Sequence, residues 1–98
     1  MSKISKNSLI SKTVEIGNDV EIGEYCVIEG AVKIGDGTKI ANNTVISGKV
    51  NIGKNNKIYS FVTLGSHPQS ISYKGEEVEL NIGDENTIRE YASLNPGT

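Results

Sequence analysis

The chain has 98 residues with 10 basic and 12 acidic side chains, giving a net charge of −2 at pH 7 and a pI near 5.3. This length allows one domain, the charge balance provides no basic patch for nucleic acid, and the N-terminal residues lack the apolar run of a signal peptide or membrane span. Cys26 is the single cysteine, which excludes an internal disulfide and favours a reducing compartment. We therefore expect a soluble cytoplasmic protein that neither binds nucleic acid nor inserts into a membrane.

An aliphatic column with a period of six residues begins at Ile4 and runs through most of the chain. Twelve of the 13 isoleucines lie on this one phase. The column comprises Ile4, Ile10, Ile16, Ile22, Ile28, Ile34, Ile40, Ile46, Ile52, Ile58 and Leu64, and after an interruption Ile82, Ile88 and Leu94. Such regularity indicates a repeat architecture.

The other positions of the six-residue repeat are patterned as well. Glycine follows the aliphatic residue at positions 17, 23, 35, 53, 65 and 83. Two positions later stand residue types that tolerate a positive φ angle, namely Asn7, Asp19, Gly37, Asn43, Asn55 and Gly97. The next position is usually small or β-branched, and Cys26 occupies it, so we expect its thiol to be packed inside.

A period of six fits a short strand followed by a turn, and fits neither a helical face nor a simple hairpin. Three such units close a triangular coil of 18 residues, and successive coils stack at about 4.8 Å. The sequence therefore predicts an all-β, single-stranded parallel β-helix of about five coils over residues 1–98. The aliphatic column should point inward, and stability should come from contacts between neighbouring coils. The hand of the coil does not follow from the pattern.

The column is interrupted between Leu64 and Ile82, where Ser70 and Glu76 stand in the aliphatic slots. The phase nevertheless survives, so we expect residues 65–81 to leave the coil as one external loop and then rejoin it. A long loop on a rigid scaffold is usually functional. The loop holds the only histidine, His67, for which a surface or subunit contact is favoured over a role as catalytic base.

Three aromatic residues, Tyr25, Phe61 and Tyr91, share one turn slot of the repeat. They either cover the corners of the column or pack between subunits, and for Phe61 we favour the contact with another subunit. The adjacent charges of Arg89 and Glu90 form either a surface ion pair of little energetic value or a contact that lines a cleft. No cluster of Cys, His and Asp has the spacing of metal ligands, and no glycine-rich loop opens a helix, so neither a metal nor a cofactor is predicted.

The Ile-Gly-x-x-Val/Thr-x repeat resembles the hexapeptide-repeat acyltransferase family, whose β-helices are left-handed. Residues 58–98 make the resemblance more specific to one group of these enzymes. The matching segments are Ile-Tyr-Ser-Phe at 58–61, Pro-Gln-x-x-x-Tyr-x-Gly-Glu at 68–76, Ile-Gly-Asp at 82–84, Ile-Arg-Glu at 88–90 and Gly-Thr at 97–98. These segments are similar to the N-terminal part of the members that acylate a nucleotide-activated amino sugar.

The resemblance implies transfer of a 3-hydroxyacyl group from acyl carrier protein to the 3-hydroxyl of UDP-N-acetylglucosamine, the first step of lipid A biosynthesis. It also implies a homotrimer with active sites in the clefts between adjacent β-helices. The loop residues that match the family's substrate-binding pattern are Gln69, Tyr73, Gly75 and Glu76, with Ser70 among them by position. His67, Phe61, Arg89 and Glu90 are candidate subunit or cleft contacts.

Two features of the chain depart from the family. Many members carry Asp where Ser70 stands and Lys where Ser72 stands. The family's catalytic base is a histidine beyond Thr98, so no catalytic residue is assigned here, and the C-terminal helical domain is also missing. We therefore expect a truncated acyltransferase chain whose own catalytic competence is open.

Two other functions remain open at this point. One is an N-acyltransferase for a nucleotide-linked amino sugar, which the serines at positions 70 and 72 allow and which would differ in its acyl donor. The other is a catalytically inactive β-solenoid that only oligomerises. That solenoid would bind no nucleotide sugar and turn over no donor.

Overall fold

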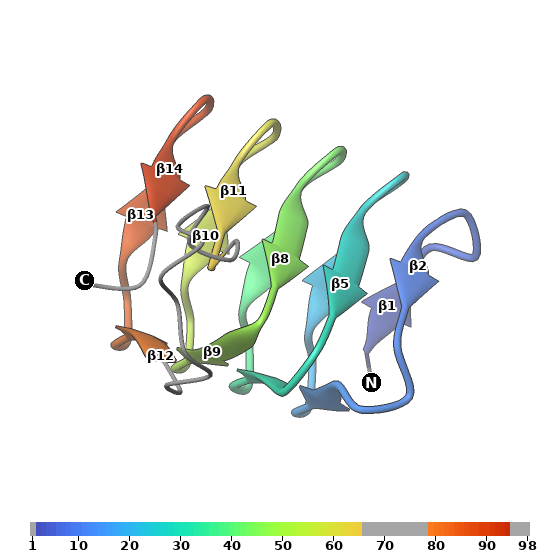
Figure 1. The fold of residues 1–98 in the computed structure, drawn as a ribbon, viewed down its shortest axis with the longest axis horizontal. Helices are drawn as coiled ribbons and strands as arrows, with labels where there is room; N and C mark the ends of the chain where they lie inside the picture. The colour runs from blue at the N-terminus through green and yellow to red at the C-terminus, as the bar shows by residue number, and fades with distance from the viewer. Residues whose placement is uncertain (1, 66–78, 95–98) are drawn as a thin grey trace, which may run out of the picture.

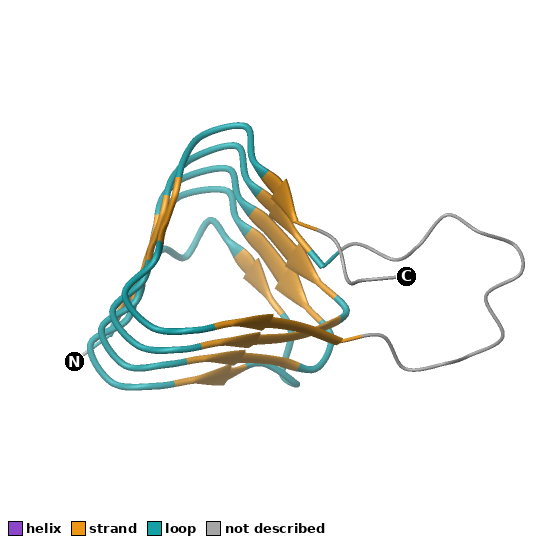
Figure 2. Ribbon diagram, turned by 90° about the vertical axis from the view of Figure 1, so that its left-hand side faces the viewer, coloured by secondary structure: helices purple, strands orange, loops and turns teal. Residues whose placement is uncertain are grey.

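The computed structural model describes residues 2–65 and 79–94, and all of the regular elements in these residues are β-strands. The strands wind into triangular coils, and each of the first four coils contributes one strand to each of three parallel sheets (Figure 1, Figure 2). The predicted all-β parallel β-helix is confirmed. Within the described residues, no helix is long and apolar enough to cross a membrane.

The three faces of the prism are named here by their strands. Sheet A consists of β1 (Lys3–Ile4), β4 (Glu21–Ile22), β7 (Lys39–Ile40), β10 (Lys57–Ile58) and β13 (Thr87–Ile88). Sheet B consists of β2 (Leu9–Ile10), β5 (Val27–Glu29), β8 (Val45–Ser47), β11 (Thr63–Leu64) and β14 (Ser93–Leu94). Sheet C consists of β3 (Glu15–Ile16), β6 (Val32–Ile34), β9 (Lys49–Ile52) and β12 (Glu79–Ile82).

The aliphatic column predicted from the sequence forms the core. Each member pairs with its equivalent in the next coil, as Ile22 with Ile40 and Ile28 with Ile46. The buried members of the column are Ile22, Ile28, Ile34, Ile40, Ile46, Ile52, Ile58, Leu64 and Ile88. Ile4 and Leu94 are 42% and 37% exposed because each stacks on a coil from one side only among the described residues.

The turn slot that was predicted to accept a positive φ does so at seven non-glycine residues. Asp19, Asn43 and Asn55 have φ between 55° and 59°, and Gly37 has φ 73°. Asn7 is an exception and is not among the positive-φ residues. The remaining four non-glycine members of the slot are Tyr25, Phe61, Glu85 and Tyr91.

Polar side chains one residue after this slot link each coil to the next. The Thr38 hydroxyl donates to the Gly53 carbonyl at 2.8 Å, and the Thr44 hydroxyl donates to the Tyr59 carbonyl at 2.9 Å. The Cys26 thiol, fully buried as predicted, donates to the Ala41 carbonyl at 3.1 Å. These bonds satisfy corner carbonyls that the ladder of strands leaves unpaired, which a buried backbone requires.

Candidate functional site

Six of the site residues predicted from the sequence lie outside the described residues: His67, Gln69, Ser70, Tyr73, Gly75 and Glu76. The structure does define the two points between which they lie. Gly65 ends the described chain after β11, and Glu79 opens β12. The segment therefore joins sheet B to sheet C, at one edge of the prism.

Both ends of this segment lie close to Val50, on β9. Leu80 pairs with Val50 in the parallel register of β9 and β12. Gly65 has φ 73°, and a Cβ atom there would collide with the Val50 side chain and the Ser47 carbonyl. Only glycine fits this turn without strain. The segment thus leaves and re-enters the coil at two neighbouring, tightly packed positions.

A polar network fixes the point where the chain re-enters the coil. The Glu79 carboxylate lies 3.2 Å from Lys49 Nζ and accepts a hydrogen bond from Asn51 Nδ2 at 3.0 Å. Asn51 Nδ2 also donates to Asn81 Oδ1 at 2.8 Å. The hydrogen bond from Lys49 is the main cause that lowers the pKa of Glu79, and Asn81 adds to it. The sequence analysis did not single out any of these residues.

We expect the pKa of Glu79 to rise toward its ordinary value when Lys49 is replaced by alanine. A depressed pKa in the folded chain means that this carboxylate stabilises the fold above its unfolded pKa and that the contribution is lost as the pH falls through the folded value. The loss therefore falls below about pH 4. Carbon-detected NMR titration of the glutamate carboxyls would measure it. Lys39→Ala, on sheet A, is the control and should leave the Glu79 titration unchanged; an unchanged titration in Lys49→Ala would contradict the expectation.

The predicted contact residue Phe61 lies at the edge between sheets A and B. Its ring stacks on Tyr91 of the next coil, with centroids 5.6 Å apart and an interplanar angle of 6°. Phe61 is 53% exposed and Tyr91 is 80% exposed, so the pair presents apolar surface to solvent. Such exposed rings are typical of contact surfaces.

Arg89 and Glu90 lie at the same edge. Arg89 Nε donates to Glu90 Oε1 at 3.1 Å, and the Arg89 guanidinium lies 4.4 Å from the centroid of Tyr59. The pKa of Glu90 is lowered first by a hydrogen bond from its own backbone amide and only then by Arg89. In the single chain the two residues form an exposed ion pair of small energetic value, and their predicted role as a cleft contact stays a prediction. The contact of Arg89 with Tyr59 is one that the sequence analysis missed.

Sheet B separates these two groups, because Phe61 and Arg89 precede it and the segment after Gly65 follows it. Three outward positions of sheet B are apolar, where the equivalent positions of the other two faces are charged or polar. The residues that precede the inward aliphatic ones are Leu9, Val27, Val45, Thr63 and Ser93 in sheet B; Lys3, Glu21, Lys39, Lys57 and Thr87 in sheet A; and Glu15, Lys33, Asn51 and Asn81 in sheet C. Sheet B also carries the exposed Glu29 at the end of β5. Leu9 is 72% exposed and Val45 is 38% exposed. Apolar side chains on one face of three mark that face for contact with protein.

The comparisons with known proteins agree with this geometry. The family model described as bacterial transferase hexapeptide (six repeats) matches residues 31–66. Over all 98 residues, the chain is 64% identical to the acyl-[acyl-carrier-protein]–UDP-N-acetylglucosamine O-acyltransferase of Sulfurimonas denitrificans. The chain carries the hexapeptide repeat over residues 31–66 and is similar along its whole length to part of this enzyme.

Other relatives show the same extent of similarity. The chain is 56% identical over its whole length to the enzyme of the same name from Thiobacillus denitrificans. It spans 38% of the length of each of these two relatives. The similarity therefore covers every residue of this chain and about a third of the relatives.

Two solved acyltransferase structures superpose closely on the chain. A crystal structure of UDP-N-acetylglucosamine acyltransferase gives a TM-score of 0.90 at 49% identity, covering 98% of this chain and 37% of that one. LpxA from Acinetobacter baumannii gives a TM-score of 0.90 at 44% identity, covering 97% of this chain and 37% of that one. The left-handed β-helix expected from the family resemblance is thereby confirmed.

Proposed function

We propose that this chain is the N-terminal β-helical part of an acyltransferase that moves a 3-hydroxyacyl group from acyl carrier protein to the 3-hydroxyl of UDP-N-acetylglucosamine, the first step of lipid A biosynthesis. The observation that carries the proposal is the 64% identity to such an O-acyltransferase over all 98 residues, which includes the segment between Gly65 and Glu79. A repeat alone would not distinguish this reaction from others on the same fold.

The chemistry assigns this part of the chain to substrate holding. The sugar hydroxyl must lose its proton as it attacks the acyl thioester, and histidine is the usual base near neutral pH. By the family resemblance that base belongs beyond Thr98. The predicted loop 65–81 is too long at its C-terminal end, because Glu79–Ile82 forms strand β12. We propose that the segment between Gly65 and Glu79 holds the nucleotide sugar, through Gln69, Ser70, Tyr73, Gly75 and Glu76. Because acyl carrier protein is the proposed donor, we place the reaction in the cytoplasm.

The proposed assembly is a homotrimer in which the outer face of sheet B is covered by a neighbouring subunit. The apolar outward side chains Leu9, Val27 and Val45 support this, as does the exposed stack of Phe61 on Tyr91 at the adjoining edge. A cleft along sheet B would lie next to Gly65 and Glu79, between which the substrate-binding segment lies. That segment and the Phe61–Tyr91 stack would then flank sheet B at its two opposite edges.

We expect Val45→Lys to dissociate the assembly without unfolding the coil. A lysine in this slot is compatible with the fold, because Lys39 occupies the equivalent slot of sheet A, yet it would place a charge in an apolar contact. Light scattering should give the mass of three 10.5 kDa chains for the unaltered protein and one for the variant. Asn51→Lys, in the same slot of sheet C, is the control and should stay trimeric. Equal masses for the two variants would remove sheet B as the interface.

Titration of the trimer with UDP-N-acetylglucosamine in a calorimeter tests the function itself. We expect saturable binding that Glu76→Gln and Gln69→Ala weaken and that Lys33→Ala, on sheet C, leaves intact. A trimer that gives no heat of binding would contradict the substrate assignment and favour the inactive solenoid. Tighter binding of a UDP-linked amino sugar than of UDP-N-acetylglucosamine would favour the N-acyltransferase.

A further inference from the structure

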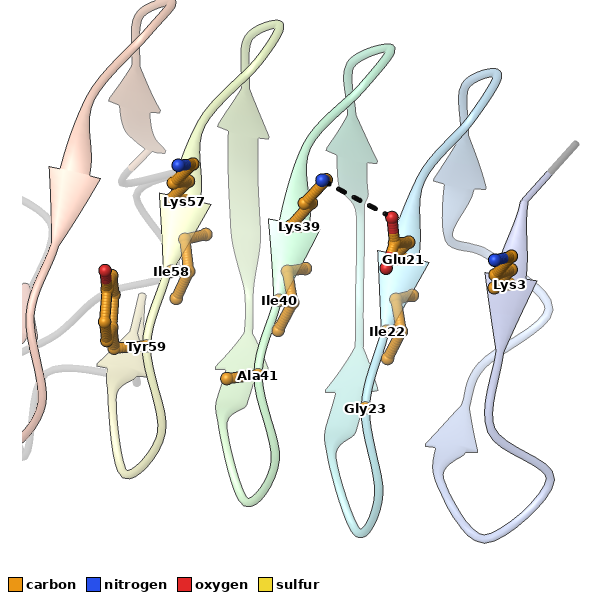
Figure 3. Close-up of a pocket in the computed structure, with 10 residues that line it drawn as sticks. All are labelled: Lys3, Glu21, Ile22, Gly23, Lys39, Ile40, Ala41, Lys57, Ile58 and Tyr59. Carbon is orange, nitrogen blue, oxygen red and sulfur yellow. Dashed lines mark ion pairs between the residues drawn. The ribbon is translucent and has the colours of Figure 1, made fainter.

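The outer face of sheet A carries a groove of about 380 Å³ that the proposed acyl transfer does not use (Figure 3). It crosses β1, β4, β7 and β10, and so extends along the prism axis over four coils. Its volume falls within the range of small-ligand sites. Sheet A lies opposite the edge between sheets B and C, where Gly65 and Glu79 lie.

The floor of the groove is the backbone of the strands at Ile22, Ile40 and Ile58, whose side chains point into the core. Backbone amides beside it are already paired, as Ala41 N donates to the Ile58 carbonyl at 2.8 Å. A ligand lying on this floor would therefore meet few free polar groups, and its apolar contacts would come from Ala41, the Tyr59 ring and the aliphatic stems of the lysines.

One wall of the groove is formed by two small residues, Gly23 and Ala41, and ends at the large side chain of Tyr59. Gly23, Ala41 and Tyr59 occupy the same outward slot in successive coils (Figure 3). Gly23 has a local reason, since a Cβ atom there would collide with Asn42 Oδ1, which accepts from the Glu24 amide. Ala41 and Tyr59 occupy equivalent positions in successive coils, so this position can hold a large side chain. Tyr59 is held in place by the Arg89 guanidinium, 4.4 Å from its ring centroid.

The other side of the groove is a row of charged residues with an excess of cations. Lys3, Lys39 and Lys57 stand in it with Glu21, which lies 3.6 Å from Lys39 Nζ (Figure 3). This pair leaves Lys3 and Lys57 without an ion pair to any residue that the structure describes. A positive row on a chain of net charge −2 is a local feature and does not follow from the overall composition. Its charge is complementary to an anion.

We propose that this groove binds a small amphipathic anion, with its apolar body over Gly23 and Ala41 against Tyr59 and its carboxylate or phosphate beside Lys57. Ala41 and the lysine stems account for the apolar body, the Tyr59 ring for its position at one end, and the Lys57 ammonium, which has no ion pair among the described residues, for the charged head. The Lys57 and Tyr59 side chains flank Ile58 of the same strand, so head and body can be held by one coil.

The test uses 1-naphthyl phosphate as the probe, followed by amide NMR shifts of the labelled chain. We expect saturable shifts centred on Gly23, Ala41 and Tyr59. Lys57→Ala should weaken binding about two- to fivefold, which is the effect of losing one exposed ion pair. Ala41→Tyr should abolish binding by filling the groove. This variant should fold, because Tyr59 fills the same slot one coil on, and the unchanged amide spectrum of sheets B and C would verify it.

Two controls decide whether the site is specific. Lys33→Ala removes an exposed lysine from sheet C, where it faces Glu15 at 3.9 Å, and should leave the affinity unchanged. Uncharged 1-naphthol should bind more weakly than the phosphate. Shifts spread over all three faces, equal losses in Lys33→Ala and Lys57→Ala, or full binding in Ala41→Tyr would each overturn the proposal. Protection of these amides by a second copy of the chain, with no probe binding, would also overturn it.

Discussion

Replacing Ile46 with alanine is expected to lower the free energy of unfolding by about 3 kcal/mol, within the usual range for truncating a buried isoleucine. Ile46 is fully buried and pairs with Ile28 on one side and Leu64 on the other. The three side chains form part of one continuous stack, so the cavity would open between two coils at once. Close-packed neighbours with paired backbones cannot collapse into it fully.

Urea denaturation followed by circular dichroism would measure this change as a shift of the midpoint at constant slope. Ile4→Ala is the matched control, because Ile4 occupies the same inward slot but is 42% exposed. Its expected loss is about 1 kcal/mol or less, in proportion to the smaller apolar area buried. Equal losses at Ile4 and Ile46 would mean that the interior of the coil does not set the stability.

Replacing Gly30 with alanine is expected to be the most disruptive single-methyl change in the described chain. Gly30 has φ 98°, and a Cβ atom there would lie 2.5 Å from the Gly48 carbonyl oxygen and 2.9 Å from the Gly48 nitrogen. Both atoms belong to the backbone of the next coil, so no flexible side chain can move aside. Strain at this φ alone costs about 1–3 kcal/mol, and the contact with the next coil adds to it.

Gly83→Ala is the control for this substitution. Gly83 has no positive φ, and among the described residues the nearest atom to an added Cβ is Asn86 Nδ2 at 3.9 Å, which is ordinary contact. The control should be nearly neutral in thermal unfolding. A Gly30→Ala variant as stable as Gly83→Ala would show that neighbouring coils can separate at this corner with little loss.

The architecture could be predicted from the sequence because a single interaction repeats in it. Each member of the aliphatic column is buried by its equivalents in adjacent coils, so a six-residue period in the sequence becomes a stack in space. The positive φ of the turn slot could be predicted at Asp19, Asn43 and Asn55 because these residue types recur at the same position of the repeat. Tyr25, Phe61 and Tyr91 take the same conformation without the residue preference that would have predicted it, because the stacked coils over-determine the turn.

The candidate site was less predictable because its contacts cross the interruption. Tyr59 meets Arg89, and Lys49 meets Glu79, through pairs that are 30 residues apart where undisturbed coils place partners 18 apart. Which residues make contact depends on where the chain rejoins the coil. The aliphatic phase fixes the separation between partners only to a multiple of six residues. Leu9, Val27 and Val45 recur every 18 residues in the sequence, so their apolar character could have been noticed there. That they share the outer face of sheet B was recognised only from the structure.

The 30-residue separation between partners on β9 and β12 has a consequence for how the chain could acquire its loop. The entropy of closing a flexible segment grows only with the logarithm of its length, so lengthening the separation from 18 to 30 residues costs about 0.5 kcal/mol. This is less than the burial of a single methylene group in the core. A prism edge is therefore a place where a protein of this design can gain a new segment almost without thermodynamic penalty, while each coil keeps its neighbours.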